Sequence, residues 1–130
     1  MNILGIDYGK NKVGLALAEG PLAYPYAAIK YKSERELLTR LEAIIKKEFI
    51  NKIVVGISEG KSAESQQKFS GFLTEKFNIE VVLQDETLST SDAQILSRES
   101  GMKRIKRKSL EDAFAATIIL QSYLDQTSEE

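Results

Sequence analysis

The hydrophobic pattern of the chain begins with two short apolar runs separated by a polar turn. Residues 2–7 and 12–18 are rich in aliphatic side chains, and Gly, Lys and Asn fill most of the gap between them. Runs of this length that are bounded by Gly and Asn predict two strands joined as a hairpin. The first run ends in a carboxylate, Asp7, which stands among apolar neighbours. A carboxylate in such surroundings needs a partner or a metal, or else it caps the turn by accepting from backbone N–H groups.

The next segment combines an edge strand with an amphipathic helix. Two prolines interrupt the chain, and residues 26–31 then predict a third strand, placed at an edge of the sheet because of the prolines beside it. Ser33 and Glu36 have the spacing of a capping box. Apolar positions at helical spacing follow them, which predicts a helix over residues 34–48.

The middle of the chain continues with strand and helix patterns in turn. Residues 53–57 form an unbroken apolar run, typical of a central strand that is buried on both faces. We predict a polar loop over residues 58–65, followed by a helix marked by Phe and Leu positions between 69 and 77. Residues 79–83 predict another strand.

The last third of the chain predicts two more helices. One begins near Ser89 or Thr90 and ends before Gly101, a residue suited to the left-handed position after a helix. The other covers residues 109–124, and its small residues would allow close packing on a sheet.

This order of elements predicts an α/β fold with a mixed five-stranded sheet. Three strands joined by short turns, followed by strand–helix–strand crossovers, give the strand order 3-2-1-4-5 with helices on both faces. That is the ribonuclease H-like arrangement. We expect one such domain over residues 1–125 and a frayed polar tail over residues 126–130.

Composition limits the chemistry, because the chain contains neither cysteine nor histidine. Disulfides, thiolate metal sites and the commonest general base are therefore absent. Any metal must bind to oxygen ligands, which indicates Mg²⁺, Mn²⁺ or Ca²⁺. The net charge is −1, so binding to nucleic acid would require a local basic patch.

The sequence shows neither a membrane-spanning run nor a targeting signal. No apolar run approaches the length of about 20 residues that a membrane helix needs. The N-terminus lacks the basic region and cleavage site of a signal peptide. We therefore expect a soluble cytoplasmic protein.

Several short motifs, in order and at suitable spacing, resemble the YqgF/RuvX family of Holliday-junction resolvases and pre-16S rRNA nucleases. The motifs extend over nearly the whole chain: 4–9 (LGIDYG), 13–16 (VGLA), 53–56 (IVVG), 85–90 (DETLST), 112–113 (DA), 115–116 (AA) and 119–121 (ILQ). The chain departs from the usual family pattern at residues 57–60, where the family has Leu-Pro and a longer Gly-rich loop. A second departure is Thr87, where the family commonly has Arg.

The resemblance implies a ribonuclease H-like fold and a metal-dependent nuclease. Its substrate would be the 5′ end of precursor 16S rRNA, Holliday-junction-like DNA, or both. It places catalytic and metal-binding carboxylates at Asp7, Glu86 and Asp112. Three acids from three elements suit two Mg²⁺ or Mn²⁺ ions about 3.5–4 Å apart, which activate a water and neutralise the leaving oxygen.

Each flanking acid also has a structural interpretation. Asp112 lies three residues after Ser109 and would also fit as the acid of a capping box. Glu86 would also fit as a solvated loop acid. Glu59, which follows the central strand at 53–57, is a reserve metal ligand.

Residues 102–108 carry five Lys and Arg side chains and no acid. The run precedes Asp112, so a phosphate backbone bound by it would lie near the proposed metal ions. Such a run can also be only a solvated loop. The residues that we predict to contact nucleic acid are Lys103, Arg104, Lys106, Arg107, Lys108, Lys10 and Lys12.

Two other functional interpretations remain open at this point. A non-catalytic scaffold that binds rRNA or a ribosome-assembly partner could retain the same acids. The Asp7–Gly9 hairpin also resembles the first phosphate loop of actin-like ATPases, although the chain has no second loop of that kind. The sequence leaves open RNA or DNA as substrate, and a monomer or a homodimer.

Overall fold

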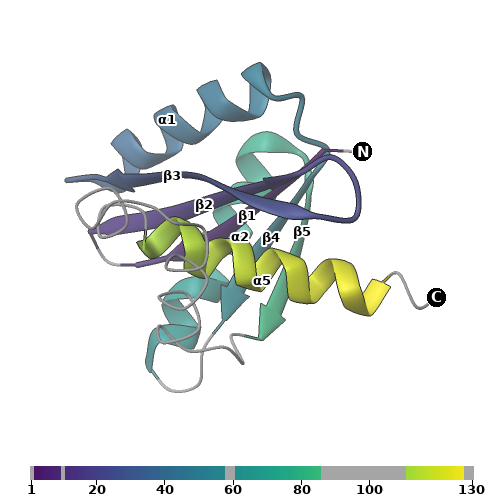
Figure 1. Cartoon of the computed structure of the whole chain (residues 1–130). Coiled ribbons are helices and arrows are strands. Elements are labelled where there is room, and N and C mark those ends of the chain that lie inside the picture. The colour runs from purple at the N-terminus through teal and green to yellow at the C-terminus, as the bar shows by residue number, and fades with distance from the viewer. Residues whose placement is uncertain (1, 10, 58–60, 86–110, 128–130) are drawn as a thin grey trace.

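The computed structural model describes residues 2–9, 11–57, 61–85 and 111–127 (Figure 1). Strands come first and the last described element is a helix. In chain order the elements are β1 (Ile3–Tyr8), β2 (Lys12–Ala18), β3 (Ala23–Lys30), α1 (Glu34–Lys47), β4 (Lys52–Ile57), α2 (Lys61–Phe77), β5 (Glu80–Asp85) and α5 (Glu111–Thr127).

The five strands form one sheet in the order β3-β2-β1-β4-β5. The hairpin strands β1 and β2 pair antiparallel, as do β2 and β3, whereas β4 runs parallel to both β1 and β5. The predicted α/β fold with the mixed order 3-2-1-4-5 is therefore confirmed, with β1 at the centre. Because β1, β4 and β5 are parallel, their carboxyl ends meet at one edge of the sheet.

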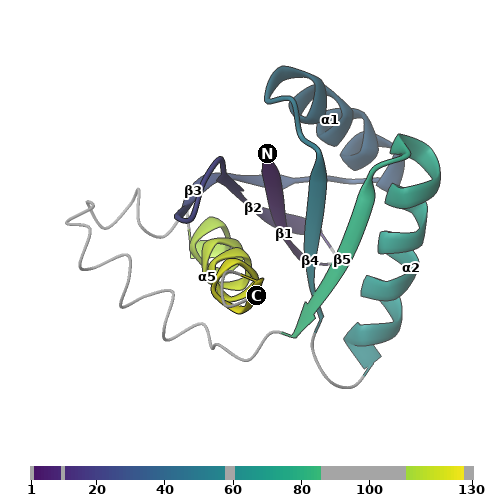
Figure 2. The ribbon, with the colours of Figure 1, turned by 90° about the vertical axis from the view of Figure 1, so that its right-hand side faces the viewer.

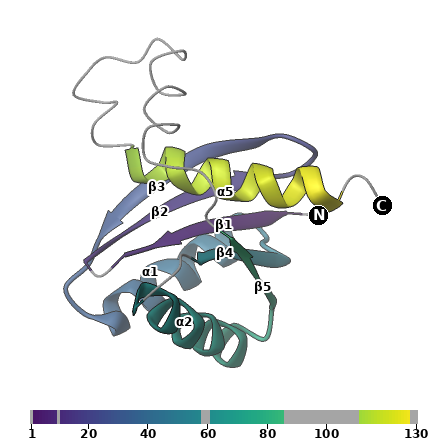
Figure 3. The ribbon, with the colours of Figure 1, turned by 90° about the horizontal axis from the view of Figure 1, so that it is seen from below.

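Helices cover both faces of the sheet (Figures 2 and 3). One face carries α1 and α2, whose buried Leu37, Leu41, Phe69 and Leu73 pack with alternate residues of the central strands. The opposite face carries α5 alone among the described helices, and its Ala116, Ile119 and Leu120 form a second buried cluster with β1, β2 and β4. Alternation along the strands thus separates two cores, as expected for a sheet that is buried on both sides.

The close packing of α5 depends on a glycine in the central strand. A Cβ atom added to Gly5 would lie 2.8 Å from the Cβ of Leu120 and 3.2 Å from the carbonyl oxygen of Ala116. The small side chains predicted to permit close packing are present, since Ala113 and Ala116 are buried. Helix and strand backbones approach this closely because both partners have small residues at the contact.

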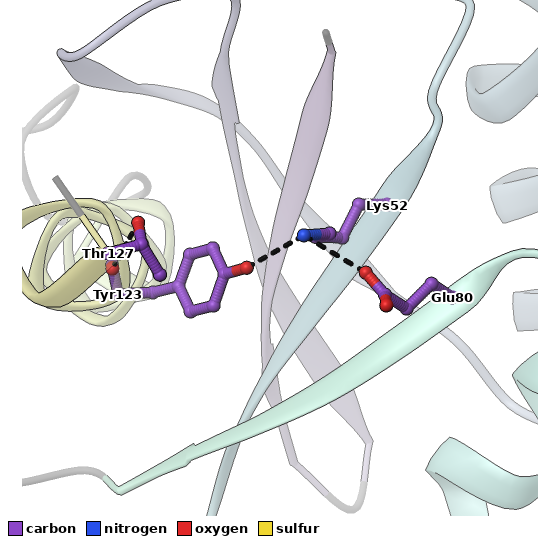
Figure 4. Close-up of polar contacts among 4 residues, drawn as sticks. All are labelled: Lys52, Glu80, Tyr123 and Thr127. Atoms are coloured by element: carbon purple, nitrogen blue, oxygen red, sulfur yellow. Dashed lines mark hydrogen bonds and ion pairs between the residues drawn. The ribbon is translucent and has the colours of Figure 1, made fainter. Parts of the chain in front are cut away.

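The C-terminal half of α5 is anchored by polar contacts at the other edge of the sheet (Figure 4). The Lys52 ammonium donates to the Tyr123 hydroxyl at 2.8 Å and forms an ion pair with Glu80 at 2.9 Å. Gln121 accepts from the backbone N–H of Ala23 and donates to the carbonyl oxygen of Pro21. These contacts connect α5 to β3, β4 and β5.

The first helix begins as predicted. The Ser33 hydroxyl accepts from the backbone N–H of Glu36 at 3.2 Å, which caps α1. The Glu36 carboxylate accepts from the N–H of Lys32, one residue before the position that a capping box would use.

The third strand starts earlier than predicted, at Ala23, and includes Pro25. Pro25 has no N–H to donate, and it is tolerated because β3 is an edge strand with a bulge opposite Leu15 and Ala16. The predicted edge position is therefore confirmed, whereas the start at residue 26 is wrong.

The predicted loop over residues 58–65 is wrong for its second half, because α2 begins at Lys61. Glu64 and Ser65 lie near the start of the helix and are polar and exposed, so they give no hydrophobic signal for a helix. An acid in the first turn favours the helix through its dipole.

The last helix runs to Thr127, beyond the predicted end at residue 124. The helix predicted between residues 89 and 101 lies outside the described residues. No helix in the described part of the chain is long and apolar enough to cross a membrane.

Candidate functional site

Asp7 lies near the carboxyl end of β1, in the centre of the sheet. Its side chain is half-buried and lies on the α5 face, since alternate residues Ile3 and Gly5 contact α5 from the same strand. The parallel strands β1, β4 and β5 all end at this edge. In open α/β sheets, ligands bind beyond the carboxyl ends of such strands.

The sheet register and one glycine bring Asp112 to the same place. Asp7 is paired with Gly14 across the β1–β2 hairpin, so both face α5. A Cβ atom added to Gly14 would lie 1.8 Å from the carbonyl oxygen of Asp112 and 2.9 Å from the N atom of Ala113. The first turn of α5 therefore rests directly on Gly14, so two of the three predicted acids, one on the first strand and one on the last described helix, adjoin the same glycine.

Asp112 has a charged partner from the neighbouring strand. The Nζ atom of Lys12 lies 3.2 Å from its Oδ2 atom. The Lys12 side chain is 58% exposed and that of Asp112 is 31% exposed, so both groups are open to solvent. The cation and the carboxylate thus form a partly exposed pair between β2 and α5.

The hairpin turn is closed by its own backbone. The N–H of Gly9 donates to the carbonyl oxygen of Lys12 at 3.0 Å, so this donor of the turn is bonded to a backbone oxygen. The end of β3 supports the turn from outside: the N–H of Tyr31 donates to the carbonyl oxygen of Asn11 at 2.9 Å, and the Tyr31 hydroxyl donates to the carbonyl oxygen of Gly9.

Aromatic side chains hold this turn on the face opposite to α5. Tyr8 stacks on Phe69 of α2, with 4.1 Å between ring centroids. Burial, together with the neighbouring Tyr8, raises the pKa of the Tyr31 phenol above its usual value. The Tyr31 hydroxyl therefore stays protonated through the neutral range and remains a donor to Gly9.

All of the remaining predicted site residues lie outside the described part of the chain. Among the described residues, no three Asp, Glu, His or Cys side chains gather closely enough to hold a metal ion. The undescribed predicted residues are Glu86, the reserve ligand Glu59, Lys10, Lys103, Arg104, Lys106, Arg107 and Lys108. Ser109, the proposed cap before Asp112, is undescribed as well.

The two described acids beside Gly14 are of a type that fits a hard divalent cation. Asp7 and Asp112 offer only oxygen atoms, which Mg²⁺ and Mn²⁺ prefer. They come from different elements, and the ammonium of Lys12 already lies at ion-pair distance from Asp112. The corner formed by Asp7, Lys12, Gly14 and Asp112 therefore accommodates a positive charge beside the Asp112 carboxylate.

Sequence reasoning missed two residues of this corner. Gly14 had been noted only as part of a strand motif, yet it lets α5 rest on β2. Lys30 is paired with Lys12 across β2 and β3, so a second cation faces the same side. Lys30 is identified only by its pairing with Lys12, and that pairing is known only once the register between β2 and β3 is known.

The sequence matches the family described as "RuvX: Holliday junction resolvase" over residues 1–126. The chain belongs to the RuvX family. A *Bacillus cytotoxicus* protein named "Putative pre-16S rRNA nuclease" is 38% identical to it, over 96% of this chain and 98% of that protein. A *Caldanaerobacter subterraneus* protein of the same name is 40% identical, over 96% of both chains.

Solved structures support the fold of this RuvX-family chain. *Thermus thermophilus* RuvC in complex with a Holliday junction substrate has a TM-score of 0.66 at 15% identity, over 99% of this chain and 96% of that one. Fowlpox virus resolvase with Holliday junction DNA has a TM-score of 0.64 at 15% identity, over 98% and 99%. The chain therefore has the ribonuclease H-like fold that the strand order predicted.

Proposed function

We propose that this RuvX-family chain is a metal-dependent nuclease that hydrolyses phosphodiester bonds in structured nucleic acid. The 5′ end of precursor 16S rRNA and Holliday-junction-like DNA are its proposed substrates, by analogy with the names of its relatives and structural neighbours. The observation that carries the proposal is that Asp7 and Asp112 both adjoin Gly14, near the carboxyl edge of the parallel strands.

The proposed roles follow from position. Asp7 on the central strand and Asp112 on α5 hold Mg²⁺ or Mn²⁺, with Glu86 as the third ligand and Glu59 in reserve. A bound ion of this kind supplies an activated water and neutralises charge on the leaving oxygen. Asp7, nearest the middle of the sheet, orients the ions, and Asp112 approaches from the helix side. The chain needs no histidine for this chemistry.

Nucleic acid contact is proposed for the basic residues around this corner. Lys12 lies beside Asp112, and the run from Lys103 to Lys108 precedes it in the sequence. Cations that neutralise backbone phosphates give binding that weakens with salt. The domain proposed for this function covers residues 1–125.

The test is a cleavage screen with Mg²⁺ and Mn²⁺ on a precursor 16S rRNA fragment and on a four-way DNA junction. We expect Asp7→Asn and Asp112→Asn each to lower the cleavage rate by about a hundredfold or more, since a lost ligand removes several kcal/mol of charge stabilisation. The matched control is Asp125→Asn, an exposed acid at the other end of α5. It should cut at the wild-type rate.

The same screen separates the alternatives. Tight binding to rRNA without cleavage by any variant or metal would favour the non-catalytic scaffold. Full activity of Asp7→Asn would remove Asp7 from the mechanism. If Asp112→Asn melts at a lower temperature yet cuts at the wild-type rate, Asp112 is a helix cap, and Glu59 is the next ligand to test.

A further inference from the structure

Lys12 forms an ion pair with Asp112, a carboxylate that is proposed as a metal ligand. Its ammonium lies 3.2 Å from the Asp112 carboxylate, which is the geometry of an ion pair rather than of distant attraction. Lys12 is exposed and Asp112 is half-buried, and ion pairs that are open to solvent contribute little to stability. Such a pair is therefore weak enough to be broken by a stronger partner of either group.

A second lysine stands directly beside this pair. Lys30 of β3 is the register partner of Lys12 of β2, so the two side chains share the α5 face of the sheet. Lys30 is exposed. Like charges directly opposite each other across two strands repel, and Asp112 offsets that repulsion for Lys12. If Asp112 took another cation, two adjacent lysines would face solvent with an unbalanced charge.

We propose that Lys12 exchanges partners during binding: it pairs with Asp112 before a divalent cation arrives, and with a backbone phosphate afterwards. Lys12 and Lys30 together then form a phosphate subsite on the β2–β3 side of the proposed metal site. This inference rests on the proposed function, because it requires Asp112 to be a metal ligand. It assigns a role to Lys30, and it makes substrate binding depend on the metal.

Electrostatics determines the direction of the exchange. An ammonium and a divalent cation repel when both contact the same carboxylate, and the doubly charged ion interacts more strongly with it. Lys12 leaves, and its long, flexible stem lets the ammonium reach a new anion without movement of the strand. The phosphate backbone of nucleic acid is the anion that the proposed substrate supplies.

The first measurement is Mn²⁺ binding by titration calorimetry, without nucleic acid. We expect Lys12→Met to bind Mn²⁺ about fivefold more tightly than the wild type, because the internal competitor is gone. Lys12→Gln should behave in the same way, and Lys12→Arg should remain near the wild type. Lys46→Met is the matched control, since Lys46 also forms an exposed ion pair, with Glu42 at 3.1 Å on α1. It should leave Mn²⁺ binding unchanged.

The second measurement is the salt dependence of binding to a short DNA duplex, in a chelator and in Ca²⁺, with intact DNA verified on a gel. The slope of log K against log salt is negative. In Ca²⁺, Lys12→Met and Lys30→Met should each make it less steep by about 0.9. In the chelator, Lys12→Met should change the slope much less, because Lys12 is then paired with Asp112.

The outcomes distinguish this inference from the function on which it rests. If the wild type binds Mn²⁺ and Lys12→Met binds it no more tightly, the exchange is wrong while the proposed nuclease stands. Equal loss of slope for Lys12→Met in chelator and in Ca²⁺ would also overturn the exchange. If no variant binds Mn²⁺, both the inference and the metal-dependent function are wrong.

Discussion

The two ends of α5 each place a lysine from a strand against a group on the helix, but the two arrangements differ. Near the C-terminal end, Lys52 is only 19% exposed and bonds to both Tyr123 and Glu80. At the N-terminal end, Lys12 is 58% exposed and its described ion pair is with Asp112. The same type of residue is thus enclosed at one end and accessible at the other.

This difference indicates which end is a structural anchor and which end can bind a ligand. At the anchor, the Lys52 ammonium is held between the Tyr123 phenol and the Glu80 carboxylate. These two contacts restrict its movement. At the other end, a carboxylate that is bonded to one mobile cation can accept another.

The largest expected effect comes from Gly14→Ala, which would break the N-terminal contact. The added methyl group would lie 1.8 Å from the carbonyl oxygen of Asp112, so the start of α5 must move. We expect a loss of about 1–3 kcal/mol in the free energy of unfolding, as for other overpacked sites. Displacement of Asp112 should also lower the cleavage rate by about a hundredfold. Urea unfolding and the cleavage assay measure the two effects.

Gly71→Ala is the control for that substitution. Gly71 lies within α2, and a Cβ atom added there meets nothing within 4 Å. Alanine should raise the free energy of unfolding by about 0.5–1 kcal/mol, because it restricts the unfolded chain and favours the helix. Wild-type cleavage by Gly14→Ala would show that the contact with β2 does not position Asp112.

The second effect concerns the anchor and depends on pH. Lys52→Met removes two hydrogen bonds from a charged donor and should lower the free energy of unfolding by about 1–2 kcal/mol at neutral pH. The hydrogen bond to Tyr123, and then that to Glu80, raises the pKa of Lys52 above its ordinary value of 10.5. A raised pKa means that the stabilisation is fully present below about pH 10.5 and is lost as the pH rises through the higher folded-state value.

Unfolding curves of the wild type and Lys52→Met between pH 7 and 11 check this prediction. The difference in stability should be constant up to about pH 10 and should shrink above it. Cleavage at neutral pH should stay near the wild-type rate. A difference that grows with pH would contradict the assignment of the raised pKa to these hydrogen bonds.

The smallest expected effect is that of Lys12→Met on stability. The pair with Asp112 is exposed, and its loss is offset by relief of repulsion between Lys12 and Lys30. The free energy of unfolding should therefore change by no more than about 0.5 kcal/mol. A loss as large as that of Lys52→Met would show that both ends of α5 are anchors.

The sequence predicted the sheet well because its signals are local. The hairpin around Asp7 is specified by apolar runs and a Gly–Asn turn, and β4 by an unbroken apolar stretch. The start of α2 was missed because Glu64 and Ser65 form helical turns without burying a side chain. The start of β3 was missed because Pro25 usually excludes a strand, and only the edge position and the bulge permit it.

The sequence predicts which residues belong to the candidate site, but it does not predict which of them contact each other. Asp7 and Asp112 are identified from motifs, and the structure places both beside Gly14. The roles of Gly14 and Lys30 depend on which residues lie opposite them in the fold. The identity of a single residue does not reveal that pairing. The catalytic roles of Asp7 and Asp112 stay predictions, as do those of Glu86, Glu59 and the basic run, which lie outside the described residues.

The position of the two acids also has a consequence for biosynthesis. Asp7 is translated before the rest of the sheet, whereas Asp112 follows only after all five strands. The contact between Gly14 and α5 has a large loop-closure entropy, so it forms late compared with the β1–β2 hairpin. A chain that stalls before α5 therefore lacks Asp112, and under the proposed function it would have an incomplete metal site.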